Sequence, residues 1–206
     1  MESMQESKSR ISSDRIVDEI DQARAQEYAL LAVLLSRSPD AEMIGRLALL
    51  RGDASPLGVA HAELGEAAVR ANEESAGREY FDLFAGLGKG LLLSYASHYL
   101  EGSLYGRALA RLRETLQQLG IERAAGHSEP EDHAALICEI MAGLVGGDIA
   151  GPVGADREFF EKHLAPWIRR FFVDLEKAES VDFYARVGLL GRIFVDVETE
   201  AFALSA

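Results

Sequence analysis

Apolar residues recur every three or four positions along most of this 206-residue chain. This spacing gathers them on one face of an α-helix, whereas a half-buried β-strand requires apolar and polar residues to alternate. We find no run of alternating, β-branched residues between turn signals. The sequence therefore predicts an all-α protein, a single helical domain of about 8–11 helices in two closely packed lobes.

Prolines, glycines and short polar residues mark where helices are expected to begin and end. Ser55 followed by Pro56 is typical of an N-cap residue with proline at the first helical position. We expect Pro39 and Pro166 to open helices in the same way. Residues 104–119 predict an amphipathic helix closed by Gly120, and the last helix is expected over residues 181–202.

Changes in composition suggest how the chain is organised. Residues 1–16 are polar and are expected to be disordered. An N-terminal helical lobe is expected over residues 17–120, a polar hinge or connector over 121–129, and a C-terminal helical lobe over 130–204. The sequence shows no internal repeat.

Charge and cysteine content restrict the class of partner and the compartment. The formal net charge is -13, which opposes binding to a phosphate backbone and favours a basic peptide or protein partner. Cys138 is the single cysteine and lies in an apolar run, so we expect a buried thiol and no intramolecular disulfide. The N-terminus lacks a signal-peptide core and no apolar run is long enough to span a bilayer, so we expect a cytoplasmic protein without membrane insertion or nucleic-acid binding.

The stretch SEPEDHAALICEIM, residues 128–141, carries the densest group of ionisable side chains. A helix start alone explains Pro130 in the first turn, with Glu131 and Asp132 at the positive end of the helix dipole. It does not explain His133, whose potential positive charge would lie at the wrong end. Two other interpretations are a metal site and an acid–base pair of Asp132 and His133, but neither the ligand spacing of zinc sites nor a nucleophile accompanies these residues.

Two further segments have some features of a binding site. GLGKG, residues 86–90, lacks the first glycine and the Ser/Thr of a phosphate-binding loop, so we expect a flexible loop after a helix. The aromatic stretch LLLSYASHYL, residues 91–100, places Tyr95 and Tyr99 four residues apart with Ser97 between them. Aromatic residues at helical spacing pack into a core more often than they form a site.

Several of these segments, taken in order, resemble the TorD/DmsD/NarJ family of redox-enzyme maturation chaperones. The resemblance covers the chain from about Glu27 to Phe202. Its specific marks are the E-P-x-D-H motif continued by Glu139 and Met141, the run YFDLFAG at 80–86, the pattern Y-x-S-x-Y at 95–99, H-L-x-P-W at 163–167 and Phe183-Tyr184.

The resemblance implies a TorD-like helical chaperone without catalytic activity, cofactor or resident metal. Such a chaperone binds the catalytic subunit of a molybdoenzyme, often through its twin-arginine signal peptide, until the cofactor is inserted. Carried onto this sequence, the family's peptide-binding positions are Tyr95, Ser97, Tyr99, Glu129, Pro130, Asp132 and His133. Ser94 stands where the family usually has proline, and this departure bears on the aromatic segment.

The sequence of residues 109–144 looks most like that of family members associated with formate dehydrogenases. The family includes both monomers and homodimers. The alternative function is a small nucleotide-binding protein or enzyme that uses the Asp132/His133 site. A purely structural helical adaptor is the third possibility.

Overall fold

A computed structural model describes residues 18–85, 91–122, 129–179 and 181–204, and within these ranges it contains α-helices and no β-strand, which confirms the all-α prediction. The α-helices are α1 (Glu19–Ser36), α2 (Ala41–Leu47), α3 (Pro56–Arg70), α4 (Glu73–Tyr80), α5 (Ala96–Glu101), α6 (Arg107–Gln118), α7 (Ala134–Gly146), α8 (Ala155–Phe159), α9 (Ile168–Glu176) and α10 (Phe183–Leu204). Short π-helical turns, η1 (Phe81–Ala85) and η2 (Phe160–Leu164), extend α4 and α8. The predicted disordered start, the GLGKG loop and most of the connector lie outside the described residues.

The N-terminus of α3 follows the sequence prediction, but that of α2 does not. The Ser55 hydroxyl accepts a hydrogen bond from the Gly58 N–H at 3.0 Å, and Pro56 is the first residue of α3. Pro39 does not open α2. Asp40 is the N-cap, because its carboxylate accepts a hydrogen bond from the Met43 N–H at 2.8 Å and so satisfies a donor that the helix leaves unpaired.

Pro166 does not open a helix either. It lies in the turn between η2 and α9, and α9 begins after Trp167. The Trp167 backbone N–H donates to the Leu164 carbonyl at 3.0 Å, and its indole N–H donates to the His163 carbonyl at 2.7 Å. These bonds fix the buried indole in the turn and delay the start of the helix.

The helix predicted from residue 104 begins later, at Arg107. The carboxylate of Glu101 accepts hydrogen bonds from the N–H groups of Arg107 and Ala108, at 2.9 Å and 2.7 Å. This carboxylate therefore caps α6 from outside the helix. Gly120 follows α6 with φ 69°, a left-handed conformation that glycine adopts without steric cost.

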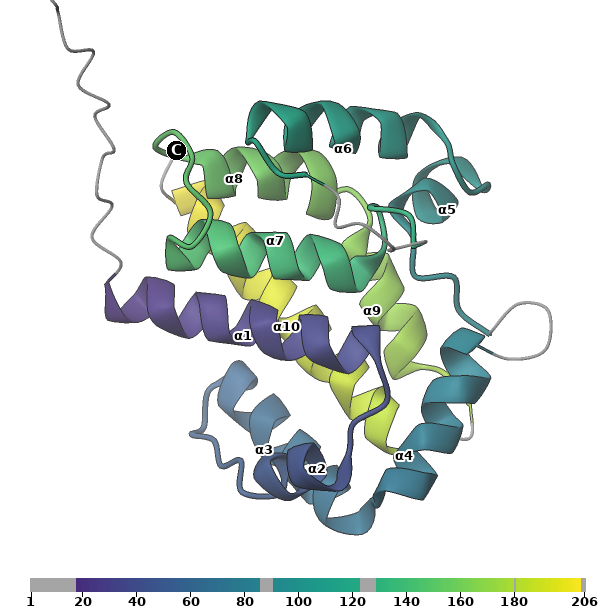
Figure 1. The fold of residues 1–206 in the computed structure, drawn as a ribbon. Coiled ribbons are helices and arrows are strands. Elements are labelled where there is room, and N and C mark those ends of the chain that lie inside the picture. The colour runs from purple at the N-terminus through teal and green to yellow at the C-terminus, as the bar shows by residue number, and fades with distance from the viewer. Residues whose placement is uncertain (1–17, 86–90, 123–128, 180, 205–206) are drawn as a thin grey trace, which may run out of the picture.

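The core forms where helices distant in sequence pack side by side. Figure 1 shows α1 and α7 running past each other in opposite directions, and this pair makes the most extensive helix–helix contact. Behind them α10 packs against α9, α3 and α1. Cys138 of α7 is buried in this core, as expected, and burial raises the pKa of its thiol to about 12.

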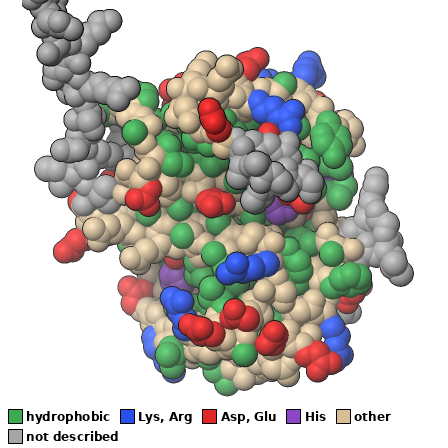
Figure 2. Space-filling view, viewed as in Figure 1, with side chains coloured by type: hydrophobic (Ala, Val, Ile, Leu, Met, Phe, Trp, Pro, Cys, Tyr) green, Lys and Arg blue, Asp and Glu red, His purple; other side chains and the backbone are tan. Residues whose placement is uncertain are grey.

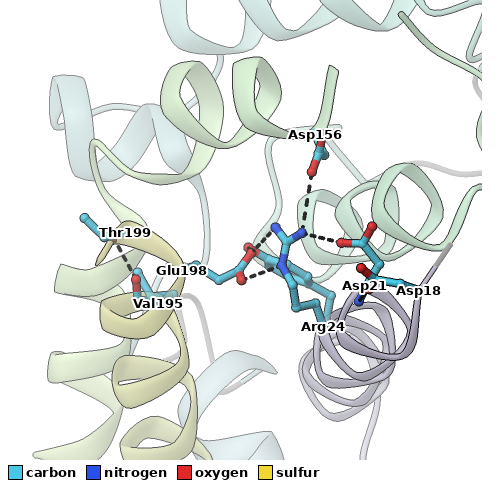
Figure 3. A network of polar contacts seen from close by, with 8 residues as sticks. Asp18, Asp21, Arg24, Asp156, Val195, Glu198 and Thr199 are labelled. Atoms are coloured by element: carbon cyan, nitrogen blue, oxygen red, sulfur yellow. Dashed lines mark hydrogen bonds and ion pairs between the residues drawn. The ribbon is translucent and has the colours of Figure 1, made fainter. Parts of the chain in front are cut away.

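A cluster of charged groups ties α1, α8 and α10 together (Figure 3). Arg24 donates to both carboxylate oxygens of Glu198, at 2.7 Å and 2.8 Å, and Tyr28 donates its hydroxyl to Glu198 at 3.0 Å. The same guanidinium lies 2.8 Å from Asp21 and 3.6 Å from Asp156. The bidentate contact fixes α1 against α10, and the longer ion pair to Asp156 connects α8 to them.

Helix α1 thus packs on α7 and α10, which belong to the predicted C-terminal lobe. The division into lobes at residues 17–120 and 130–204 stays a prediction. Among the described residues, no helix combines the length and the apolar character that a membrane span requires.

Candidate functional site

A groove of about 780 Å³ opens beside the predicted motif. It lies where α1 and α4 end, between the C-terminal half of α6 and the first turns of α7. Its lining residues are Ser36, Tyr80, Arg113, Leu116, Gln117, Gly120, Ile121, Glu122, Glu129, Glu131, His133, Ala135, Leu136, Glu139, Ile140 and Ile149. Figure 2 shows hydrophobic side chains interspersed with acidic and basic ones across the face of the molecule that Figure 1 presents.

Main-chain hydrogen bonds join the aromatic stretch to the acidic motif. Tyr95 and His133 form an isolated antiparallel β-bridge. The Ala96 N–H donates to the Asp132 carbonyl at 2.9 Å, and the Ala134 N–H donates to the Ser94 carbonyl at 2.7 Å. The aromatic stretch and the acidic motif, which are separate in the sequence, therefore lie against each other.

Asp132 and Ser97 are completely buried, with exposed fractions of 0%. The Asp132 carboxylate accepts a hydrogen bond from the Ser97 N–H at 2.8 Å, and Ser97 is the second residue of α5. Asp132 therefore caps α5 from outside the helix, at the end where a negative charge is favoured. Neither residue lines the groove.

His133 is the N-cap of α7, so the helix does not start at Pro130 as the sequence suggested. Its Nδ1 accepts a hydrogen bond from the Ala135 N–H at 3.2 Å, which requires an unprotonated nitrogen there. Burial lowers the pKa of His133, although Glu129 and Asp132 act in the opposite direction. The histidine is thus a neutral helix cap, which removes the objection that it places a positive charge at the wrong end.

Tyr95, Glu129 and His133 form one contact group at the edge of the groove. The Tyr95 hydroxyl donates to the Glu129 carboxylate, and the Tyr95 ring meets the His133 ring edge-on with centroids 5.1 Å apart. Burial and the Glu129 carboxylate raise the pKa of Tyr95, so the phenol keeps its proton. Pro130 is buried, and its carbonyl accepts a hydrogen bond from the His133 N–H at 3.2 Å.

Tyr99 belongs to a different surface. Its hydroxyl donates to Asp174 at 2.9 Å, and its ring lies 5.6 Å from Trp167. Arg170 donates to the Tyr99 carbonyl at 2.7 Å. These contacts hold α5 against α9, away from the groove lining.

Ser94, in the place of the family's proline, is also buried, with an exposed fraction of 3%. Its carbonyl accepts the Ala134 N–H, a bond that a proline carbonyl would equally accept. The hydrogen bond across the bridge is therefore kept despite the departure from the family pattern.

Several residues that line the groove are not among the site residues that the sequence predicted. Arg113 and Leu116 lie on α6, while Leu136 and Ile149 lie on or after α7. The arginine face of α6 and the wide apolar stripe of α7 were visible in the sequence. Their meeting in one groove depends on tertiary packing, which periodicity does not report.

The groove combines carboxylates with an apolar floor. Glu122, Glu129, Glu131 and Glu139 line it, and Arg113 is the cation among its described lining residues. Such a surface can pair with guanidinium or ammonium groups and bury an apolar segment beside them. Among the described residues, no three acidic, histidine or cysteine side chains are placed to hold a metal ion.

Comparison with protein families gives a match over residues 51–173 to the family described as nitrate reductase delta subunit. Chaperone protein TorD of Vibrio cholerae is 25% identical over 126 residues, 57% of this chain and 57% of that protein. A Haemophilus influenzae protein described as probable Tat proofreading chaperone DmsD is 31% identical over 114 residues, 54% of each chain. The chain thus spans between half and two thirds of the length of these curated relatives.

Among solved structures, the fold is similar to that of a crystal structure from Archaeoglobus fulgidus described as a proposed redox enzyme maturation protein. The TM-score is 0.56 at 23% sequence identity, with 84% of this chain and 93% of that chain covered. At this identity the likeness establishes the fold.

Proposed function

Because this chain belongs to the nitrate reductase delta subunit family, which includes TorD and NarJ, we propose that it is a maturation chaperone for a redox enzyme. In this proposal the chain acts in the cytoplasm, as a monomer or a homodimer, and has no catalytic activity. It binds the catalytic subunit of a molybdoenzyme, in particular its twin-arginine signal peptide, until cofactor insertion and assembly. Relatives described as TorD and DmsD chaperones support this assignment.

The groove between α6 and α7 is the observation that carries the proposal. A twin-arginine signal peptide presents two guanidinium groups next to an apolar segment. The groove offers the complementary arrangement, because Glu129 and Glu131 lie at one side and Leu116, Leu136 and Ile140 form apolar lining. Its volume of about 780 Å³ is sufficient for several side chains of a peptide.

The contacts of Asp132 and His133 favour this function over an enzyme that uses the two residues as an acid–base pair. The Asp132 carboxylate is buried and caps α5, and the His133 imidazole caps α7. Both members of an acid–base pair must reach the substrate, and Asp132 is completely buried and does not line the groove. Within the proposal, Asp132, Ser97 and Pro130 position the site, whereas Glu129 and His133 face the ligand.

We further propose a formate dehydrogenase as the client, on the resemblance of residues 109–144 to chaperones associated with that enzyme. Affinity capture from a native extract, followed by mass spectrometry, tests both levels of the proposal. Recovery of a molybdoenzyme catalytic subunit supports the chaperone function, and its identity supports or replaces the formate dehydrogenase assignment.

A charge-reversed variant of the groove, Glu139→Lys, provides the comparison for this experiment. Glu139 is exposed on α7 within the groove, whereas Glu200 is exposed on α10 outside its lining. We expect Glu139→Lys to reduce recovery of the subunit and Glu200→Lys to leave it unchanged. Equal recovery with both variants, or no molybdoenzyme subunit with the unaltered chain, would contradict the proposal.

A further inference from the structure

Within the groove, one carboxylate is already bound to a guanidinium of the chain itself. Arg113 donates from Nε and from a terminal nitrogen to the same oxygen of Glu131, at 3.0 Å and 2.7 Å. Both residues line the groove, and they come from different elements, α6 and the turn before α7. The pair shows that Glu131 is placed and oriented to receive a guanidinium from the groove side.

The two partners differ in how firmly the fold holds them. The Glu131 side chain is 10% exposed, whereas the Arg113 side chain is 50% exposed. Glu131 lies between Pro130 and Asp132, both of which are buried, in a turn closed by the hydrogen bond from the His133 N–H to the Pro130 carbonyl. The carboxylate is therefore a fixed part of the site, and the long arginine side chain is the partner able to leave.

From this asymmetry we propose that Glu131 is an arginine-binding position of the groove, which Arg113 occupies in the free chain and which an arginine of the bound peptide takes over. This inference rests on the proposed function. It adds a specificity element, because a peptide must replace a guanidinium with its own guanidinium. Arg113 thereby discriminates against ligands that bring only apolar surface to the groove.

The energetics of exposed ion pairs permit such an exchange. Because the Arg113 side chain is half exposed, its pair with Glu131 contributes little free energy, and a ligand that displaces Arg113 loses about 2- to 5-fold in affinity. The released Arg113 remains charged and moves into solvent. A lysine on the ligand is a poorer replacement, because an ammonium lacks the planar fork that approaches a carboxylate through two nitrogens.

Calorimetric titration with a synthetic peptide tests the inference. The probe carries two adjacent arginines followed by an apolar segment, and a second peptide carries lysines in their place. We expect Arg113→Gln to bind the arginine peptide about 2- to 5-fold more tightly than the unaltered chain. Arg107→Gln is the matched control, since Arg107 is an exposed arginine of α6 outside the groove lining and its replacement changes net charge equally.

Glu131→Gln completes the test. It should weaken binding of the arginine peptide and reduce the preference for arginine over lysine, and Arg113→Gln should give no gain in its presence. If the unaltered chain binds the peptide but Arg113→Gln binds no more tightly than Arg107→Gln, the inference is wrong and the proposed function stands. If neither the unaltered chain nor any variant binds the peptide, both are wrong.

Discussion

Asp132 and His133 are neighbours in the sequence, yet each completes a different helix. Asp132 accepts the Ser97 N–H at the start of α5, and His133 accepts the Ala135 N–H at the start of α7. The β-bridge between Tyr95 and His133 joins these two starts. The motif therefore acts at the residue scale as a junction that presents Glu129 and Glu131 to the groove.

Substitutions of Asp132 and Glu129 distinguish a residue that positions the site from one that contacts the bound peptide. Asp132→Ala should lower the free energy of unfolding by about 2 kcal/mol, because α5 loses its cap and buried polar groups lose a partner. Asp132→Asn retains an acceptor and should bind the arginine peptide with nearly unchanged affinity. Glu129→Gln should weaken binding several-fold with little change in stability. Chemical denaturation and calorimetry check both, and loss of binding in a stable Asp132→Asn protein would contradict the assignment.

His163 predicts a pH dependence of stability. Burial and the nearby cations Lys162 and Arg111 lower the pKa of His163 to about 4. The unfolded chain, in which a histidine titrates near its ordinary pKa of about 6.5, then binds more protons than the folded chain between these values. This contribution to stability is complete above pH ~6.5 and is lost as the pH falls toward ~4.

His163→Gln removes this titration and keeps a group able to bond Thr115, which lies 2.8 Å from the imidazole. Denaturation of both proteins at several pH values between 7 and 4 should show a smaller loss of stability for the variant. Parallel curves would show that His163 does not contribute in this way.

At the scale of elements, the sequence predicted that helices exist more reliably than where they begin. The helix start predicted from Ser55 and Pro56 was correct, because the N-cap residue and the helix are adjacent in the chain. The starts of α5, α6 and α10 depend on carboxylates outside each helix, from Asp132, Glu101 and Glu79. When the capping residue lies outside the helix and reaches it through a tertiary contact, the sequence at the start of the helix has no capping pattern.

Alanine substitutions at two helical glycines should change the stability of the protein in opposite directions. A Cβ on Gly188 of α10 would lie 2.3 Å from the Glu176 backbone nitrogen at the end of α9, whereas a Cβ on Gly45 of α2 meets nothing within 4 Å. Gly188→Ala should therefore destabilise the protein by about 1–3 kcal/mol, because the two helices must move apart. Gly45→Ala should stabilise it by about 0.5–1 kcal/mol through lower unfolded-state entropy. Urea denaturation of both variants measures the difference, and a neutral Gly188→Ala would contradict this close packing.

At the scale of the whole molecule, the contact of α1 with α7 and α10 decides where the groove opens, since Ser36 at the end of α1 lies in its lining. The sequence indicated the acidic edge and the apolar stripe of α7. It could not indicate that α6 would lie across from them, because helical periodicity defines a buried face without naming the helix that covers it.

The Arg24–Glu198 pair tests how much the packing of α1 on α10 contributes. Glu198 has an exposed fraction of 1% and bonds both Arg24 and Tyr28. Glu198→Ala should lower the free energy of unfolding by about 3 kcal/mol, since Arg24 and Tyr28 would lose a buried partner. Arg78→Gln removes the exposed Glu74–Arg78 pair and should change stability by less than about 0.5 kcal/mol. Similar effects of the two substitutions on thermal unfolding would contradict the role of this cluster.

The most direct measurement of the central claim locates a twin-arginine peptide on the chain by NMR of isotope-labelled isoleucine methyl groups. Ile121, Ile140 and Ile149 line the groove, while Ile44 and Ile168 are buried elsewhere. The account predicts saturable shifts of the three groove signals as the peptide is added, and unchanged signals for the other two. Shifts concentrated on Ile44 or Ile168, or no saturable shift at any of the five, would contradict it.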